Sequence, residues 1–125
     1  MTENEISKIV FDSALKVHKS LGPVLLKSAY EECLVYELRK YDLKVEKQKP
    51  LPLAYEKMKL EIGYRVDTLI ENKVIIEVKS VDSLNDIHTA QAITYLKLSN
   101  CKLGMLLNFN VPLIKNGIKK IANNL

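Results

Sequence analysis

The chain has 125 residues, 47% of them hydrophobic, which excludes a disordered protein and suffices for one domain over residues 1–125 with a buried core. The formal net charge of +4 favours a polyanionic partner such as nucleic acid but does not identify one. No apolar run reaches the length of a membrane span and the start, Met1 to Asn4, is acidic and polar, so we expect no membrane partner and a cytoplasmic location.

The first 44 residues predict two helices. Residues 3–21 carry apolar residues at helical spacing, and Gly22-Pro23 is expected to end this helix. A second helix is predicted to begin at Ser28, which forms a capping-box pattern with Glu31. This pattern gives Glu31 a complete structural role, which competes with any catalytic one. His18 has no second His or Cys nearby and is interpreted as a surface or satisfied histidine rather than a metal ligand.

Short strands are predicted before the break at Gly63. Residues 45–53 read as one strand, and Pro50 within it is typical of an edge strand or a bend. Residues 54–62 are expected to form another strand that passes a turn near Glu56. These elements lead directly into the central part of the chain.

The central stretch, residues 64–80, predicts two strands joined by a tight turn. Side chains alternate between the faces of a strand, so Glu77 and Lys79 share a face with Ile75. On the preceding strand, Asp67 shares a face with Leu69, whereas the other face carries Val66, Thr68 and Ile70.

The length of the turn decides whether the two acids meet. A two-residue turn would pair Asp67 with Val78, whereas a three-residue turn at residues 71–73 pairs Asp67 with Glu77. The longer turn keeps apolar residues opposite apolar residues, and Asn72 tolerates the left-handed conformation that it needs. We therefore expect the three-residue turn.

Two carboxylates placed opposite each other on neighbouring strands repel. One interpretation is a solvated polar face on which Lys79 and Arg65 neutralise Asp67 and Glu77 by cross-strand ion pairs. The other is a divalent cation held between the two acids. The hairpin by itself leaves both interpretations open.

A third helix is predicted from the capping-box pattern Ser83 to Asp86 through about Leu98. Its inward side is expected to carry Ile87, Ala90, Gln91, Thr94, Tyr95 and Leu98. Gln91 on that side requires hydrogen-bond partners or faces a site.

The apolar stretch 102–109 predicts a strand of the buried kind. The tail from residue 111 onward is ambiguous, because Ile118 and Ile121 favour a helical turn that Gly117 weakens. The order of helices, strands, helix and strand predicts an α/β fold, a mixed β-sheet flanked by helices.

With these elements in place, the chain resembles the GxxExxY family, a branch of the PD-(D/E)XK nuclease superfamily. The resemblance covers nearly the whole chain and rests on the ordered set Leu21-Gly22-Pro23, Ser28-Ala29-Tyr30-Glu31-Glu32, Gly63-Tyr64-Arg65-Val66-Asp67, Ile76-Glu77-Val78-Lys79, His88-Thr89-Ala90-Gln91 with Tyr95-Leu96, and Leu107-Asn108-Phe109. It implies a restriction-endonuclease-like core over residues 1–125.

The resemblance also implies a site. Asp67 and Glu77 would bind Mg²⁺ or Mn²⁺ through hard oxygen ligands, and Lys79 would orient the attacking water or stabilise negative charge. The acid of the first helix of the superfamily maps onto Glu31, and the Gln of its later helix maps onto Gln91.

One departure from the family pattern concerns the residues that give the family its name. Gly, Glu and Tyr at three-residue steps correspond here to Val24, Lys27 and Tyr30. If position 27 faces the metal, a base replaces an acid there.

Three hypotheses follow for the function. The first is a metal-dependent nuclease acting on DNA or RNA, and the second is a nucleic-acid-binding module that lost efficient cleavage. The third is a partner-binding or structural protein whose acids form ion pairs. The small size of the domain also suggests a homodimer or a protein partner that supplies specificity.

Overall fold

Five strands form a mixed β-sheet within residues 1–124, the part of the chain that this computed structural model describes. Across the sheet they lie in the order β1 (Val45–Pro50), β4 (Arg65–Ile70), β5 (Val74–Lys79), β6 (Leu103–Asn108) and β7 (Ile118–Ala122). Strands β5 and β6 are parallel, and the other neighbours in this sheet are antiparallel. The predicted mixed sheet is confirmed.

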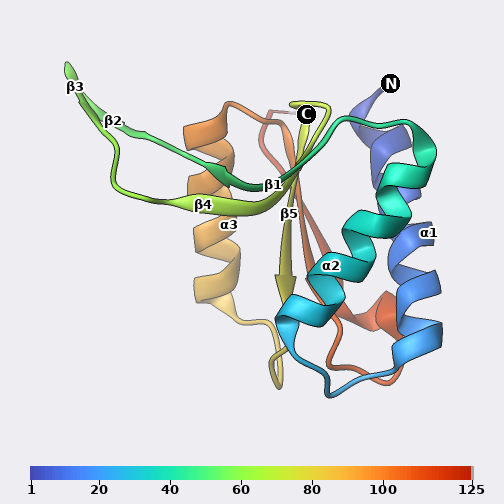
Figure 1. Ribbon diagram of the computed structural model, residues 1–125. Helices are drawn as coiled ribbons and strands as arrows, with labels where there is room; N and C mark the ends of the chain where they lie inside the picture. Colours follow the sequence, from blue (N-terminus) through green and yellow to red (C-terminus); the bar gives the residue numbers. More distant parts are fainter. Residues whose placement is uncertain (125) are drawn as a thin grey trace.

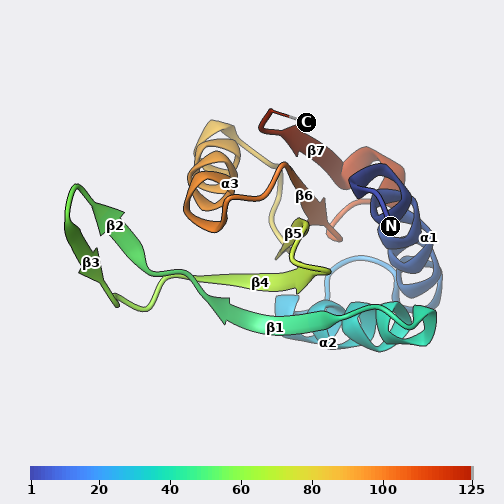
Figure 2. The ribbon, with the colours of Figure 1, turned by 90° about the horizontal axis from the view of Figure 1, so that it is seen from above.

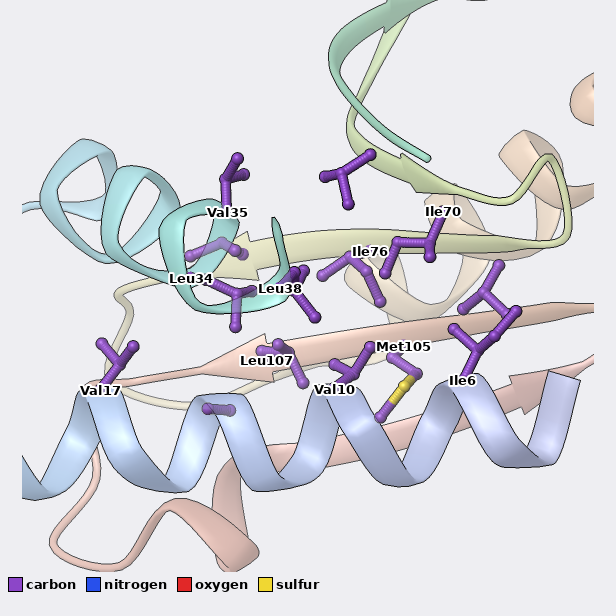
Figure 3. Close-up of a cluster of buried hydrophobic side chains, with 14 of the residues drawn as sticks. Ile6, Val10, Val17, Leu34, Val35, Leu38, Ile70, Ile76, Met105 and Leu107 are labelled. Carbon is purple, nitrogen blue, oxygen red and sulfur yellow. The ribbon is translucent and has the colours of Figure 1, made fainter. Parts of the chain in front are cut away.

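Helices cover both faces of this sheet (Figure 1). Helices α1 (Glu3–Leu21) and α2 (Lys27–Leu38) lie on one face, and α3 (Asp86–Ser99) lies on the other. Figure 3 shows how the first two helices pack their apolar side chains against the strands. The helices contribute Ile6, Val10, Val17, Leu34, Val35 and Leu38, and the strands contribute Ile70, Ile76, Met105 and Leu107. The α3 face carries a smaller apolar cluster that includes Leu69, Ile75, Ala92 and Leu96.

A two-stranded arm projects beyond the sheet next to α3 (Figure 2). It consists of β2 (Leu53–Tyr55) and β3 (Met58–Leu60), which pair antiparallel around a turn at Glu56. The chain leaves the sheet after β1 and returns to it at β4. The predicted turn near Glu56 is confirmed, but the strand expected over residues 45–53 is wrong in extent, because β1 ends at Pro50 and Leu53 begins a separate two-stranded sheet.

The first helix agrees with its prediction, whereas the start of the second differs. Gly22, at φ +69°, ends α1. Helix α2 begins at Lys27 with no side-chain cap, so the predicted capping box of Ser28 and Glu31 is wrong. The hydroxyl of Tyr30 fixes the preceding turn instead, because it donates to the Gly22 carbonyl (2.5 Å) and accepts from the Leu25 N–H (3.0 Å).

Helix α3 also differs from its prediction at its start and on its buried face. Its N-cap is Asn85 rather than Ser83, with the reciprocal bonds of a capping box made to His88. The residues buried under the helix are Ala92 and Leu96, so the expected inward position of Gln91 is wrong.

Close packing on β6 explains how α3 is rotated. A Cβ on Gly104 would lie 3.2 Å from Ile75 Cγ1 and 3.4 Å from Leu96 Cδ2. The missing side chain therefore lets Leu96 of α3 approach the sheet beside Ile75. Ile87, which was expected to face inward, is 75% exposed.

The tail forms a strand rather than the helical turn suggested by Ile118 and Ile121. After a 3₁₀ turn, η2 (Ile114–Gly117), strand β7 pairs with the edge of β6. A Cβ on Gly117 would lie 2.1 Å from the Asn108 carbonyl oxygen, so this turn requires glycine. The available edge of β6 decides the conformation of the tail, and no pattern within the tail indicates it.

Two smaller features complete the fold. A 3₁₀ turn, η1 (Arg39–Tyr41), follows α2. The ring of His18 lies 2.8 Å from the Val111 carbonyl oxygen, as expected of a satisfied histidine. Of the helices formed by residues 1–124, none combines the length and apolar character that a membrane crossing requires.

Candidate active site

The β4–β5 hairpin has the predicted register. Leu69 pairs with Ile75 and Ile70 with Val74, which leaves a three-residue turn at residues 71–73. Asn72 adopts the left-handed conformation in this turn, at φ +54°. The register places Asp67 opposite Glu77 on neighbouring strands, two residues beyond the pair formed by Leu69 and Ile75.

The ladder between the two strands opens where the acids meet. Regular pairing extends only to Thr68 opposite Ile76. Beyond it, the N–H of Asp67 donates to Glu77 Oε1 (3.3 Å), and the N–H of Val78 donates to Asp67 Oδ2 (2.8 Å). Each carboxylate thus satisfies a backbone donor of the facing strand, which holds the two acids together.

Both carboxylates are buried, with 5% of Asp67 and 4% of Glu77 exposed. Of the two interpretations left open by the hairpin, the solvated polar face is therefore wrong. Burial, followed by the negative charge of Asp67, raises the pKa of Glu77 to about 8, although the charge of Lys79 opposes this rise. The buried acid pair therefore holds a proton more tightly than an exposed carboxylate does.

The base that neutralises this pair comes from α2. Lys27 Nζ lies 3.0 Å from Asp67 Oδ1, whereas one of the two interpretations of the hairpin assigned this neutralisation to Lys79 and Arg65. Partial burial disfavours the charged lysine, but the bond to Asp67 and its negative charge outweigh this effect and raise the pKa of Lys27. The position that departs from the family pattern thus contacts a predicted metal ligand.

Glu31 belongs to the same group of side chains. The amide of Gln48 donates to Glu31 Oε1 and approaches Asp67 Oδ1 at 3.5 Å, so one amide links the two acids. Gln48 adopts φ +49° between residues of β1 that pair regularly with β4. Burial and the charge of Asp67 raise the pKa of Glu31. The bond to Gln48, rather than a helix cap, is the structural role of this carboxylate.

Lys79 and Gln91 form the other end of the site. Lys79 Nζ donates to Gln91 Oε1 at 3.4 Å, and Gln91 Nε2 donates to the Tyr95 hydroxyl at 3.3 Å. Burial and the nearby charge of Glu77 raise the pKa of Tyr95. Gln91 is thus exposed on α3 yet still reaches the predicted site.

The donor chemistry of the acid pair fits a hard divalent cation, because carboxylate oxygens are the ligands that Mg²⁺ and Mn²⁺ prefer. The fit depends on Lys27, whose ammonium group already contacts Asp67 Oδ1. Within residues 1–124, no three Asp, Glu, His or Cys side chains are placed to hold an ion together. Water or substrate oxygens would therefore have to complete the coordination of an ion bound by Asp67 and Glu77.

The structure brings all the predicted site residues to one region, in two groups. Hydrogen bonds link Asp67, Glu77 and Glu31 near the N-terminal end of α2. A separate hydrogen bond links Lys79 to Gln91 of α3. The sequence reasoning missed two members, Gln48 and the hydroxyl of Tyr95. No pattern indicates a left-handed glutamine within a strand, whereas Tyr95 was detectable from its position one helical turn after Gln91.

The described fold agrees with one comparison. A family model described as the PD-(D/E)XK nuclease superfamily matches residues 4–121. No curated protein and no solved structure matches the chain.

Proposed function

Because the chain belongs to the PD-(D/E)XK nuclease superfamily, we propose that it is a metal-dependent nuclease that hydrolyses phosphodiester bonds in DNA or RNA. The fold, a mixed sheet flanked by helices, is that of this superfamily. The observation that carries the proposal is the buried pair of Asp67 and Glu77 on adjacent strands, with Lys79 two residues further along β5.

Each residue of the site has a proposed role. Asp67 and Glu77 would hold Mg²⁺ or Mn²⁺, which when bound polarises a phosphoryl oxygen and lowers the pKa of water. Lys79 would orient the attacking water or stabilise negative charge on the phosphate. Gln91 accepts from Lys79 and would position its ammonium group, and Glu31 would position Asp67 through the shared Gln48 amide.

The contact between Lys27 and Asp67 favours a second candidate function. An ammonium group 3.0 Å from Asp67 Oδ1 already supplies the positive charge that the acid pair needs. A chain in which Lys27 keeps this position would be a catalytically weakened module that binds nucleic acid or a protein partner. The two candidates differ in whether a metal ion displaces Lys27.

We also propose that the chain lies in the GxxExxY branch. Its three named positions have separate structural tasks here. Val24 adopts φ +69°, a conformation that glycine adopts most easily; Lys27 faces Asp67; and Tyr30 closes the turn from Gly22 to Leu25. Of the three residue types that name the family, only the tyrosine is present here; valine replaces the glycine and lysine replaces the glutamate.

A nucleic-acid partner, a cytoplasmic location and the use of residues 1–125 as one domain are parts of the same proposal. The net charge of +4 and the exposed arm suit a polyanionic partner. Because so small a domain offers little surface beside its site, we also propose that a second copy of the chain or another protein supplies specificity.

The proposal is tested by incubating the protein with single- and double-stranded DNA and RNA in Mg²⁺, in Mn²⁺ and in chelator. Metal-dependent cleavage by the wild type is expected, and Lys79→Ala should lose it. The exposed Lys102 provides a matched control in Lys102→Ala, which should cleave normally. Binding without cleavage in any metal would instead support the weakened module.

A further inference from the structure

A small cavity lies beside the candidate active site, between the base of the β2–β3 arm and α3. Its volume is about 240 Å³, and it is lined by Leu53, Tyr64, Gln91, Thr94, Tyr95 and Leu98. Pockets for drug-sized ligands are larger, about 300–1,000 Å³. The cavity therefore suits one flat ring system rather than an extended ligand.

The lining of the cavity matches the chemistry of a nucleobase. Tyr64 and Tyr95 supply aromatic rings, and the aliphatic side chains of Leu53 and Leu98 supply further apolar surface. Gln91 adds an amide that can both donate and accept a hydrogen bond. A base has two apolar faces that stack on aromatic rings and a polar edge that forms hydrogen bonds.

Gln91 connects the lining of the cavity to Lys79 of the site. One end of the Gln91 amide accepts from Lys79, and the other donates to the Tyr95 hydroxyl that lines the cavity. A ligand in the cavity is thus one side chain away from Lys79, which follows Glu77 by two residues on β5. The cavity and the acid pair can contact neighbouring parts of one molecule.

Two basic residues adjoin residues that line the cavity. Arg65 directly follows Tyr64 and is exposed at the start of β4, and Lys79 lies beyond Gln91. A strand with one base in the cavity could therefore place its phosphates against these cations. A small apolar molecule or an apolar side chain from a second copy would not use this charge.

We propose that this cavity binds one unpaired base of a nucleic-acid strand and so places the adjacent phosphate at Asp67 and Glu77. The inference rests on the proposed nuclease function and gives it a substrate class. A base inside a duplex is stacked and paired, so it can enter only after leaving the helix. The substrate is accordingly single-stranded, or a duplex end or damaged site at which a base is free.

Binding of a labelled single-stranded DNA, measured by fluorescence anisotropy in chelator and in Ca²⁺, tests the proposal. Tyr64→Ala should weaken binding by about fivefold or more, as expected when one stacking ring is lost. Tyr36, which is 66% exposed on α2, gives the matched control Tyr36→Ala, expected to bind as the wild type does. A strand with abasic nucleotides should show no difference between Tyr64→Ala and the wild type.

A second measurement uses the absence of tryptophan from the chain. In Tyr64→Trp, the only indole lines the cavity, so base stacking should change its fluorescence when the base-containing strand is added, but not when the abasic strand is added. A change with protein concentration in the absence of DNA would overturn the proposal in favour of a second copy. An equal change with both strands would also overturn it.

The outcomes separate this inference from the proposed nuclease. If the wild type cleaves DNA or RNA while Tyr64→Ala binds a single strand as tightly as the wild type, the base site is refuted and the nuclease remains. If the base-dependent effects appear without cleavage in any metal, the base site remains and the nuclease is refuted. Failure of the wild type to bind any nucleic acid refutes both.

Discussion

Replacing Glu77 by Gln should stabilise the protein in the absence of metal. The substitution keeps an oxygen acceptor for the N–H of Asp67, which now lies 3.3 Å from Glu77 Oε1. It removes a carboxylate that is 4% exposed and that faces the charge of Asp67. The variant therefore retains the hydrogen bond without having to bind a proton or to bury a second negative charge.

The pKa of Glu77 gives the magnitude and the sign of the effect. Its rise from 4.5 to about 8 means that the folded state binds a proton that the unfolded chain releases between these pH values. The stabilisation by this proton is complete below about pH 4.5 and is lost as the pH rises through about 8. At about 1.4 kcal/mol per pKa unit, the loss is on the order of 5 kcal/mol.

Urea unfolding in chelator at a series of pH values measures this effect. The difference in unfolding free energy between Glu77→Gln and the wild type should grow as the pH rises from about 5 to about 9. The difference isolates Glu77, since Glu31, whose pKa is also raised, is present in both proteins. A constant difference across this range would refute the reasoning about burial and charge.

Three further substitutions test separate parts of the structure. Val24→Gly should raise the unfolding free energy by up to about 1 kcal/mol in urea titrations, because Val24 adopts φ +69° with its side chain 81% exposed; a loss of stability would contradict the assigned strain. Lys27→Ala should strengthen Mn²⁺ binding several-fold in calorimetric titrations, since it frees Asp67 Oδ1, and unchanged affinity would show that Lys27 does not compete with metal. Gly117→Ala should lower the unfolding free energy by at least about 2 kcal/mol in the same urea assay, because its Cβ would meet the Asn108 carbonyl; wild-type stability would place the turn elsewhere.

The central hairpin was predictable because its information is local. Matching Leu69 with Ile75 determines the register, and Asn72 suits the left-handed turn. Once the register is known, the opposition of Asp67 and Glu77 follows from the alternation of strand side chains. The pairing of the two acids could thus be reasoned from a stretch of 17 residues, 64–80, whereas their proposed role as metal ligands came only from the resemblance to the superfamily.

The features that were mispredicted depend on contacts between distant parts of the chain. The rotation of α3 depends on Gly104 of β6, and the strand at Ile118 forms because β6 offers an edge. The burial of the acids and their contact with Lys27 require the approach of α2 to β4. Patterns within one element contain no information about such approaches, which is why the hairpin alone could not exclude a solvated face.

The metal dependence of the melting temperature tests most directly whether Asp67 and Glu77 form a divalent-cation site. The folded chain holds the two acids together and the unfolded chain does not, so millimolar Mg²⁺ or Mn²⁺ should raise the melting temperature of the wild type with concentration. Glu77→Gln should lose this response, whereas Glu61→Gln, at an exposed acid, should keep it. No metal-dependent shift in the wild type, with or without a short DNA strand, would contradict the proposed site.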